Sequence, residues 1–105
     1  MMNRTILAAL ITLETLGLSI TDHRLERELR KPGLTPTATI NALGSLHMQS
    51  FAMEVKLIAA CKGWAARIEK MADTEIAANW PTVTERYLAM AAFLQMKSQL
   101  PQEAA

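Results

Sequence analysis

The sequence predicts a single, mainly α-helical domain, and three observations carry that prediction. The chain has 105 residues, which is enough for one small domain, and half of them are hydrophobic while only 20% are charged. Helix start signals recur along it, and Thr35-Pro36 and the pattern Thr82-x-x-Glu85 are the clearest of them. The apolar residues are dominated by Leu, Ala, Met and Ile, with only five aromatics. This composition excludes a disordered tail, a collagen-like repeat and a low-complexity linker.

The charges nearly cancel, because 11 basic residues oppose 10 acidic ones for a net charge of +1. This balance excludes a histone-like polybasic protein and an acidic DNA mimic. The charges are nevertheless unevenly placed, since residues 1–72 hold nine basic and six acidic side chains whereas residues 73–105 hold two and four. The single cysteine excludes an intramolecular disulfide framework and a Cys-rich zinc ribbon.

The amino-terminal segment has two interpretations. Arg4 followed by the apolar run of residues 6–11 looks like the start of a secretory signal. Glu14 interrupts that run, however, and no small-x-small cleavage pattern follows within residues 15–22. An amphipathic helix capped by Asn3 fits better, and it predicts a cytoplasmic protein. The run is also too short to span a membrane, so no membrane partner is expected.

Two short helices are predicted next, joined by a Gly-containing turn. Thr21 is a good N-cap for the first, and Ile20 and Leu25 have the spacing of a hydrophobic staple around it. Pro32-Gly33 ends this helix, and Thr35-Pro36 begins the next, which runs to about Met48.

Residues 51–68 fit two periodicities about equally well. Met53, Val55 and Leu57 alternate with polar or small residues, which indicates a β-hairpin with its turn at residues 61–63. Read with a spacing of 3.5 residues, the same stretch places Leu57, Trp64 and other apolar residues on one side of a helix. Its Ala, Met, Lys, Glu and Leu content favours the helix, whereas Gly63 counts slightly against it. Both interpretations stay open from the sequence alone.

The carboxyl-terminal part predicts a short helix over residues 74–79 that Asp73 caps, then a helix from Thr82 to about Gln99. Residues 87–94 are all apolar, so this last helix is not a simple surface helix. One interpretation is a central core helix of a monomer. The other is an association helix, residues 82–99, that pairs with another subunit in a homodimer or with a protein partner. The residues predicted at that interface are Tyr87, Met90, Phe93 and Leu94.

The sequence offers little for catalysis. His23 and His47 are the only histidines, and Cys61 lies in an Ala-rich run where a small buried residue is expected. There is no metal-ligand spacing, no phosphate-binding Gly-rich loop and no Ser/His/Asp setting. We therefore expect no enzyme, no catalytic residue, no metal and no cofactor.

The helix at residues 20–30, the turn with Gly33 and the helix at residues 35–46 together resemble a helix-turn-helix DNA-binding unit. A hairpin at residues 51–68 would make the unit similar to the winged variant, and the resemblance covers about residues 5–68. It implies that the second helix of the pair enters the major groove of double-stranded DNA. The implied base contacts are Thr37, Ala38, Asn41 and Ser45. The implied phosphate contacts are Arg24, Arg27, Lys31 and, at the wing tip, Lys62.

Two functions are therefore expected as alternatives. In the first, one domain combines a helix-turn-helix core at residues 4–72 with the association helix, and regulates transcription as a dimer that occupies an operator. The absence of Arg and Lys from the reading helix weakens it, since Arg to guanine is the commonest specific contact. In the second, the chain is a small accessory or inhibitory module that docks an apolar face onto a larger protein.

Overall fold

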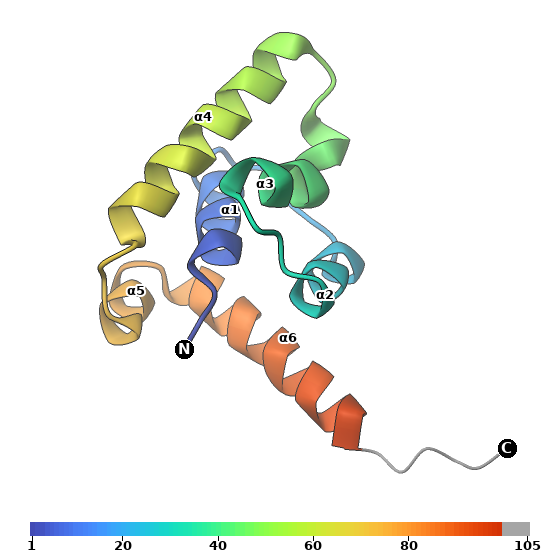
Figure 1. Cartoon of the computed structure of the whole chain (residues 1–105), viewed down its shortest axis with the longest axis vertical. Helices are drawn as coiled ribbons and strands as arrows, with labels where there is room; N and C mark the ends of the chain where they lie inside the picture. The colour runs from blue at the N-terminus through green and yellow to red at the C-terminus, as the bar shows by residue number, and fades with distance from the viewer. Residues whose placement is uncertain (100–105) are drawn as a thin grey trace, which may run out of the picture.

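The computed structural model describes residues 1–99, and this part of the chain is mainly helical, as predicted (Figure 1). The elements, in chain order, are α1 (Arg4–Thr15), α2 (Asp22–Arg30), α3 (Pro36–Gly44), the 3₁₀ turn η1 (Ser45–His47), α4 (Phe51–Ile68), α5 (Asp73–Asn79) and α6 (Pro81–Gln99). No β-strand occurs among these 99 residues.

Helix α1 is the centre of the domain, and α3, α4 and α6 pack around it (Figure 1). The side chains of residues 6–13 are all buried. Asn3 caps the helix as predicted, because its side-chain oxygen accepts a hydrogen bond of 3.0 Å from the Ile6 N–H. The apolar run that resembles a secretory signal is thus the most buried segment of the fold.

Side-chain caps set the start of α2, α3 and α4. The predicted caps are confirmed, since Thr21 Oγ1 accepts from the Arg24 N–H at 3.3 Å and Thr35 Oγ1 accepts from the Ala38 N–H at 3.1 Å. Ser50 caps α4 in the same way, which the sequence interpretation missed. Helix α3 ends at Gly44, earlier than the predicted Met48, and the chain tightens into η1.

Of the two interpretations left open for residues 51–68, the helix is confirmed and the wing hairpin is wrong, because these residues form the single helix α4. Leu57, Cys61 and Ile68 are its buried side chains, and their spacing follows one face of a helix. Val55 would share a hairpin face with Leu57, yet it is 48% exposed. Gly63 lies on the open side of α4, so it costs some helix stability but no packing.

Two predicted starts near the carboxyl end are also wrong. Asp73 does not cap α5, which begins at Asp73 itself, but pairs with Arg4 and accepts a hydrogen bond from the Met2 N–H. Helix α6 begins at Pro81, so Thr82 lies inside its first turn rather than at its cap. Proline suits the first helical position because its missing N–H is unneeded there. The Asn3 N–H donates to Tyr87 Oη at 2.9 Å, which ties α6 to the start of the chain.

Candidate nucleic-acid interface

Helix α3 lies in front of α1 and presents one uncharged face outward (Figure 1). Its inner residues Thr39, Ile40, Leu43 and Gly44 are buried against α1 and α4. Of the predicted base-contact residues, Ala38 and Ser45 are exposed, while Thr37 and Asn41 are half-buried at the edges of the same face. The structure therefore places all four on the accessible side of α3.

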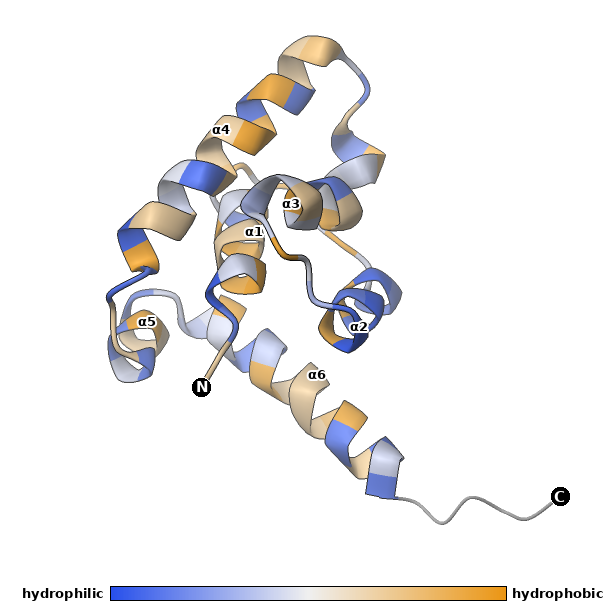
Figure 2. Ribbon diagram, viewed as in Figure 1, coloured by the Kyte–Doolittle hydropathy of each residue, from blue (hydrophilic) through white to orange (hydrophobic). Residues whose placement is uncertain are grey.

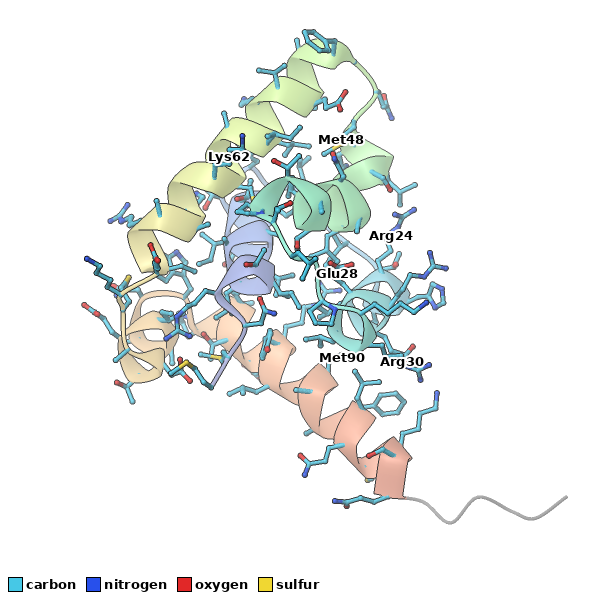
Figure 3. The ribbon with its side chains drawn as sticks, in the orientation of Figure 1. Arg24, Glu28, Arg30, Met48, Lys62 and Met90 are labelled. Carbon is cyan, nitrogen blue, oxygen red and sulfur yellow. The ribbon has the colours of Figure 1, made fainter. Side chains whose placement is uncertain are left out.

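Arg24 and Ser45, predicted to contact phosphate and base respectively, are brought together. The Arg24 guanidinium donates to Ser45 Oγ and, at 3.2 Å, to the carbonyl oxygen of Ala42. These hydrogen bonds connect the first turn of α2 with the last turn of α3. The positive charge of Arg24 therefore lies beside the carboxyl-terminal end of the outward face of α3 (Figure 3).

The remaining basic side chains of α2, with Lys31 just after it, form a basic cluster, which we define as His23, Arg27, Arg30 and Lys31. They line a shallow hollow together with Glu26. Glu26 accepts an ion pair from Arg30 at 3.0 Å and another from Lys97 at 3.5 Å. Arg27 and Lys31 have no ion pair within residues 1–99. His23 and Arg30 were not among the predicted contacts, although their spacing on α2 puts them near Arg27.

Lys62 does not lie at a wing tip, because it is on the exposed side of α4. Its neighbour Cys61 packs against the start of α3, with the thiol 3.6 Å from the carbonyl oxygen of Pro36. Figure 3 shows Lys62 and Arg24 on opposite sides of α3. The uncharged outward face of α3 is therefore flanked by cations from α2 on one side and from α4 on the other.

The three acidic residues of α2 are each either ion-paired or buried. Asp22 pairs with Arg86 at 2.9 Å, and Glu26 is engaged as described above. Glu28 is only 7% exposed and lies between α2 and α3 (Figure 3). Three acids interleave with the cations in the sequence. In the fold Asp22 and Glu26 are ion-paired and Glu28 is buried, so Arg27 and Lys31 are left without an acidic partner in residues 1–99.

Gly33 sets how closely α2 and α3 approach each other. A Cβ atom at this position would overlap the buried hydroxyl Thr39 Oγ1 and lie 2.8 Å from Glu28 Oε1. Glycine is therefore required here by the close approach of Glu28 and Thr39, which are contributed by the two helices. The turn predicted at Pro32-Gly33 thus has a packing role as well.

No catalytic constellation appears in the described residues. No group of three His, Cys, Asp or Glu side chains within residues 1–99 could hold a metal ion. Cys61 is buried, as expected, and burial raises the pKa of its thiol to about 11. His47 makes a structural contact, because its Nε2 lies 2.5 Å from the carbonyl oxygen of Ser19.

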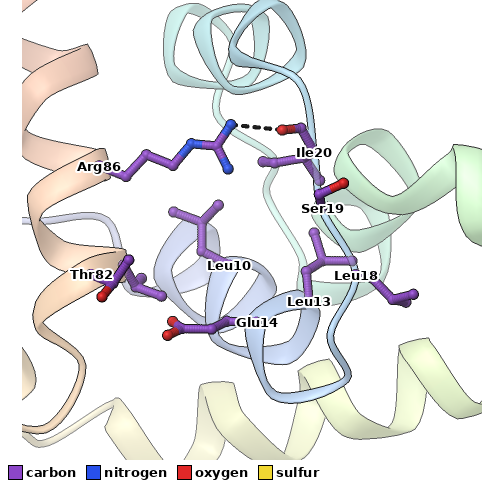
Figure 4. Close-up of a pocket in the computed structure, with 9 residues that line it drawn as sticks. Leu10, Leu13, Glu14, Leu18, Ser19, Ile20, Thr82 and Arg86 are labelled. Atoms are coloured by element: carbon purple, nitrogen blue, oxygen red, sulfur yellow. Dashed lines mark hydrogen bonds between the residues drawn. The ribbon is translucent and has the colours of Figure 1, made fainter.

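A small pocket lies between α1, the loop after it and α6 (Figure 4). Its walls are mainly apolar and include Leu10, Leu13 and Val83. The Arg86 guanidinium at its edge donates to the carbonyl oxygen of Ile20 at 2.7 Å. Glu14, Ser19 and Thr82 also line the pocket, but within residues 1–99 no hydrogen bond joins either hydroxyl to the carboxylate, so we assign no reaction to it.

The predicted interface residues of α6 face in different directions. Tyr87 is only 8% exposed and Met90 and Leu94 are half-buried, so these three belong mostly to the inner side of the helix. Phe93 is 46% exposed. The outward side of α6 instead carries Leu88, Ala89, Ala92, Phe93 and Met96.

Comparisons of the chain with models of known families, with curated proteins and with solved structures found no significant match. Within residues 1–99, none of the helices combines the length and the apolar character that a membrane span needs.

Proposed function

We propose that the protein binds double-stranded DNA with α3 in the major groove and regulates transcription by occupying an operator. The observation that carries this proposal is the arrangement around α3. An accessible uncharged face lies between the cations of α2 and Lys62 of α4, while the acids of α2 are paired or buried. Phosphate groups border both sides of a DNA groove, so cations on both sides of a reading helix suit that target.

The dimensions of α3 suit the major groove. An α-helix is about 10–12 Å across with its side chains, which matches a groove about 12 Å wide, and the nine residues of α3 give about two and a half turns to lie in it. Asn41 can form two hydrogen bonds with adenine, because its amide nitrogen donates and its amide oxygen accepts. Ala38 or the Thr37 methyl can contact the thymine methyl. No side chain of α3 is suited to the paired acceptors of guanine. We therefore expect a preference for A·T-rich sites and a large share of the affinity from phosphate contacts.

Fluorescence anisotropy with labelled A·T-rich and G·C-rich duplexes tests this proposal. Affinity should fall steeply between about 50 and 200 mM salt because each phosphate contact releases counterions. The pair Arg27→Ala and Lys31→Ala should weaken binding to both duplexes and reduce the logarithmic salt slope by about 0.9 per lost contact. Lys70→Ala is the matched control, since it removes an exposed cation after α4.

Asn41→Ala should behave differently from the charge variants. It should weaken binding to the preferred duplex by about 1–3 kcal/mol while leaving the salt slope unchanged, because it removes a base contact. Absence of any binding to duplex DNA at about 50 mM salt would refute the proposal, since non-specific binding alone should be detectable there.

A second candidate function is a helical module that docks onto a larger protein. Large apolar side chains that are at least 46% exposed favour it, and beyond Met1 they are Leu34, Leu46, Phe51, Val55, Leu88, Phe93 and Met96. Of these, Leu88, Phe93 and Met96 share the outward side of α6, and contiguous exposed apolar surface marks association sites. A stable complex with a protein, together with no salt-sensitive binding to duplex DNA, would favour this candidate over the first.

A further inference from the structure

The pocket between α1 and α6 combines an apolar wall with a guanidinium at its edge (Figure 4). Leu10 and Leu13 of α1 and Val83 of α6 supply the wall. Helix α1 is coloured as hydrophobic over most of its length, so the side of the pocket that it forms is apolar (Figure 2). The pocket has a volume of about 190 Å³. Since an apolar cavity of about 150 Å³ holds benzene, there is room here for one six-membered ring and a small head group.

The guanidinium of Arg86 keeps part of its hydrogen-bonding capacity free. Within residues 1–99 both of its contacts are made by one terminal nitrogen, Nη2, which donates to the carbonyl oxygen of Ile20 at 2.7 Å and to the Asp22 carboxylate at 2.9 Å. The other terminal nitrogen, Nη1, has no acceptor in this part of the chain, and it points toward Leu10 (Figure 4). The Arg86 side chain is 36% exposed, so a ligand can reach it. Guanidinium N–H groups are permanently charged and bind carboxylates strongly.

Glu14 limits the charge that a ligand of this pocket can carry. It also lines the pocket, but it makes no ion pair with Arg86 within the described residues, and the two side chains lie on opposite sides of Leu10 (Figure 4). A second anionic group, at the end of the ligand away from Arg86, would therefore be repelled by the Glu14 carboxylate. One negative charge at one end of an apolar body suits the pocket, whereas a dicarboxylate does not.

From these three features we infer that the pocket binds a small monocarboxylate with an apolar body, of the size of benzoate or hexanoate. The carboxylate accepts a hydrogen bond from Arg86 Nη1, and the ring or chain lies against Leu10, Leu13 and Val83. The inference does not depend on DNA binding. A ligand with so few atoms gains limited binding free energy, so we expect a dissociation constant of about 0.1–1 mM.

The position of the pocket connects this ligand with the start of α2. Arg86 contacts Ile20 and Asp22, the two neighbours of Thr21, which is the N-cap of α2. A carboxylate on the same guanidinium therefore binds the folded arrangement of α1, α2 and α6 and not the unfolded chain. Saturating benzoate should accordingly raise the melting temperature by a few degrees, whereas acetate at the same ionic strength, which lacks the apolar body, should not.

Titration of the full chain with benzoate, followed by the NMR signals of its methyl groups, tests the site. The signals of Leu10, Leu13 and Val83 should shift and saturate. Benzamide has the same shape without the charge, and terephthalate adds a second carboxylate at the far end of the ring. Both should bind at least about tenfold more weakly than benzoate. Absence of shifts at these methyl groups with about 10 mM benzoate, or equal binding of benzamide, would overturn the inference.

Variants separate the ligand contact of Arg86 from its structural contacts. Arg86→Gln should weaken benzoate binding at least about tenfold. Asp22→Asn is the matched control, because it removes the same ion pair but keeps the guanidinium, and its affinity for benzoate should be at least that of the wild type. The pair Arg27→Ala and Lys31→Ala should also bind benzoate normally, because these cations lie outside the pocket.

Unchanged affinity in Arg86→Gln, or an equal loss in Asp22→Asn, would refute the proposed contact. A loss in the Arg27→Ala and Lys31→Ala pair would instead place the carboxylate at the basic cluster of α2, and would refute it as well. Circular dichroism checks that each variant is folded. If Arg86→Gln does not fold, the comparison of benzoate with benzamide on the wild-type chain decides the question.

Discussion

Substitution of Gly33 tests how the α2–α3 unit is held together. The glycine does not have a positive φ, so alanine is compatible with its backbone conformation. In open space, Gly33→Ala would therefore stabilise the protein by about 0.4–1 kcal/mol, through the lower entropy of the unfolded chain. The space here is not open. The new Cβ would overlap Thr39 Oγ1 and lie 3.2 Å from Thr39 Cβ and 2.8 Å from Glu28 Oε1.

The contacts of the new Cβ decide whether Gly33→Ala stabilises or destabilises the fold. The Glu28 carboxylate ends a flexible side chain and can move, but Thr39 is β-branched and fully buried, so its hydroxyl cannot leave without a change of rotamer. Overpacking of a dense site costs about 1–3 kcal/mol, which exceeds the entropic gain. We expect Gly33→Ala to destabilise the fold by about 1–2 kcal/mol, which corresponds to a urea midpoint lower by about 1 M.

A second substitution isolates the cause. Thr39 Oγ1 is buried without a hydrogen-bond partner in the described residues, so Thr39→Ala loses a methyl group but also removes an unsatisfied hydroxyl. In the Thr39→Ala background, Gly33→Ala should cost less than 0.5 kcal/mol, because the overlapping atom is gone. Urea unfolding followed by circular dichroism measures all four proteins. A neutral or stabilising Gly33→Ala in the wild-type background would refute the reasoning.

Three further predictions concern other parts of the fold. Leu57→Ala should destabilise by about 2–5 kcal/mol and Val55→Ala by less than about 0.5 kcal/mol in urea unfolding, because only the first side chain is buried. The hydrogen bonds from Arg4 and from the Met2 N–H hold the pKa of Asp73 below its usual range. The stability that this carboxylate contributes should therefore be present above about pH 4 and lost at lower pH, and Asp73→Asn should abolish that loss. Cys61 should react with a thiol reagent at pH 8 only as fast as the protein opens, since its thiol pKa is raised to about 11 by burial.

Local signals in the sequence were enough to place the helix starts that depend on one side chain and its own backbone. Thr21 and Thr35 were recognised because an N-cap acts over three residues. The secondary structure of residues 51–68 could not be assigned in the same way. Its apolar residues satisfy both periodicities, and only the packing of Leu57 and Cys61 against α1 and α3 selects the helix.

The candidate surfaces depended on distant contacts to different degrees. The outward residues of α3 were predictable, since Ile40 and Leu43 define the opposite, buried side of the helix. The orientation of α6 was not, because an unbroken apolar run indicates no preferred side. The hydrogen bond from the Asn3 N–H to Tyr87 Oη, 84 positions away in the chain, helps to turn Tyr87 inward and Leu88 outward.

A net charge of +1 is compatible with a DNA-binding surface because the fold separates the charges. The only two cations of residues 73–105, Arg86 and Lys97, both lie on α6 and pair with acids of α2, namely Asp22 and Glu26. These ion pairs neutralise the acids that would otherwise oppose Arg27 and Lys31 on the same short helix. Helix α6 thus supports the proposed DNA surface from behind α2. Arg86→Gln should accordingly weaken DNA binding even though Arg86 contacts no DNA, and the loss should shrink when Asp22→Asn is combined with it.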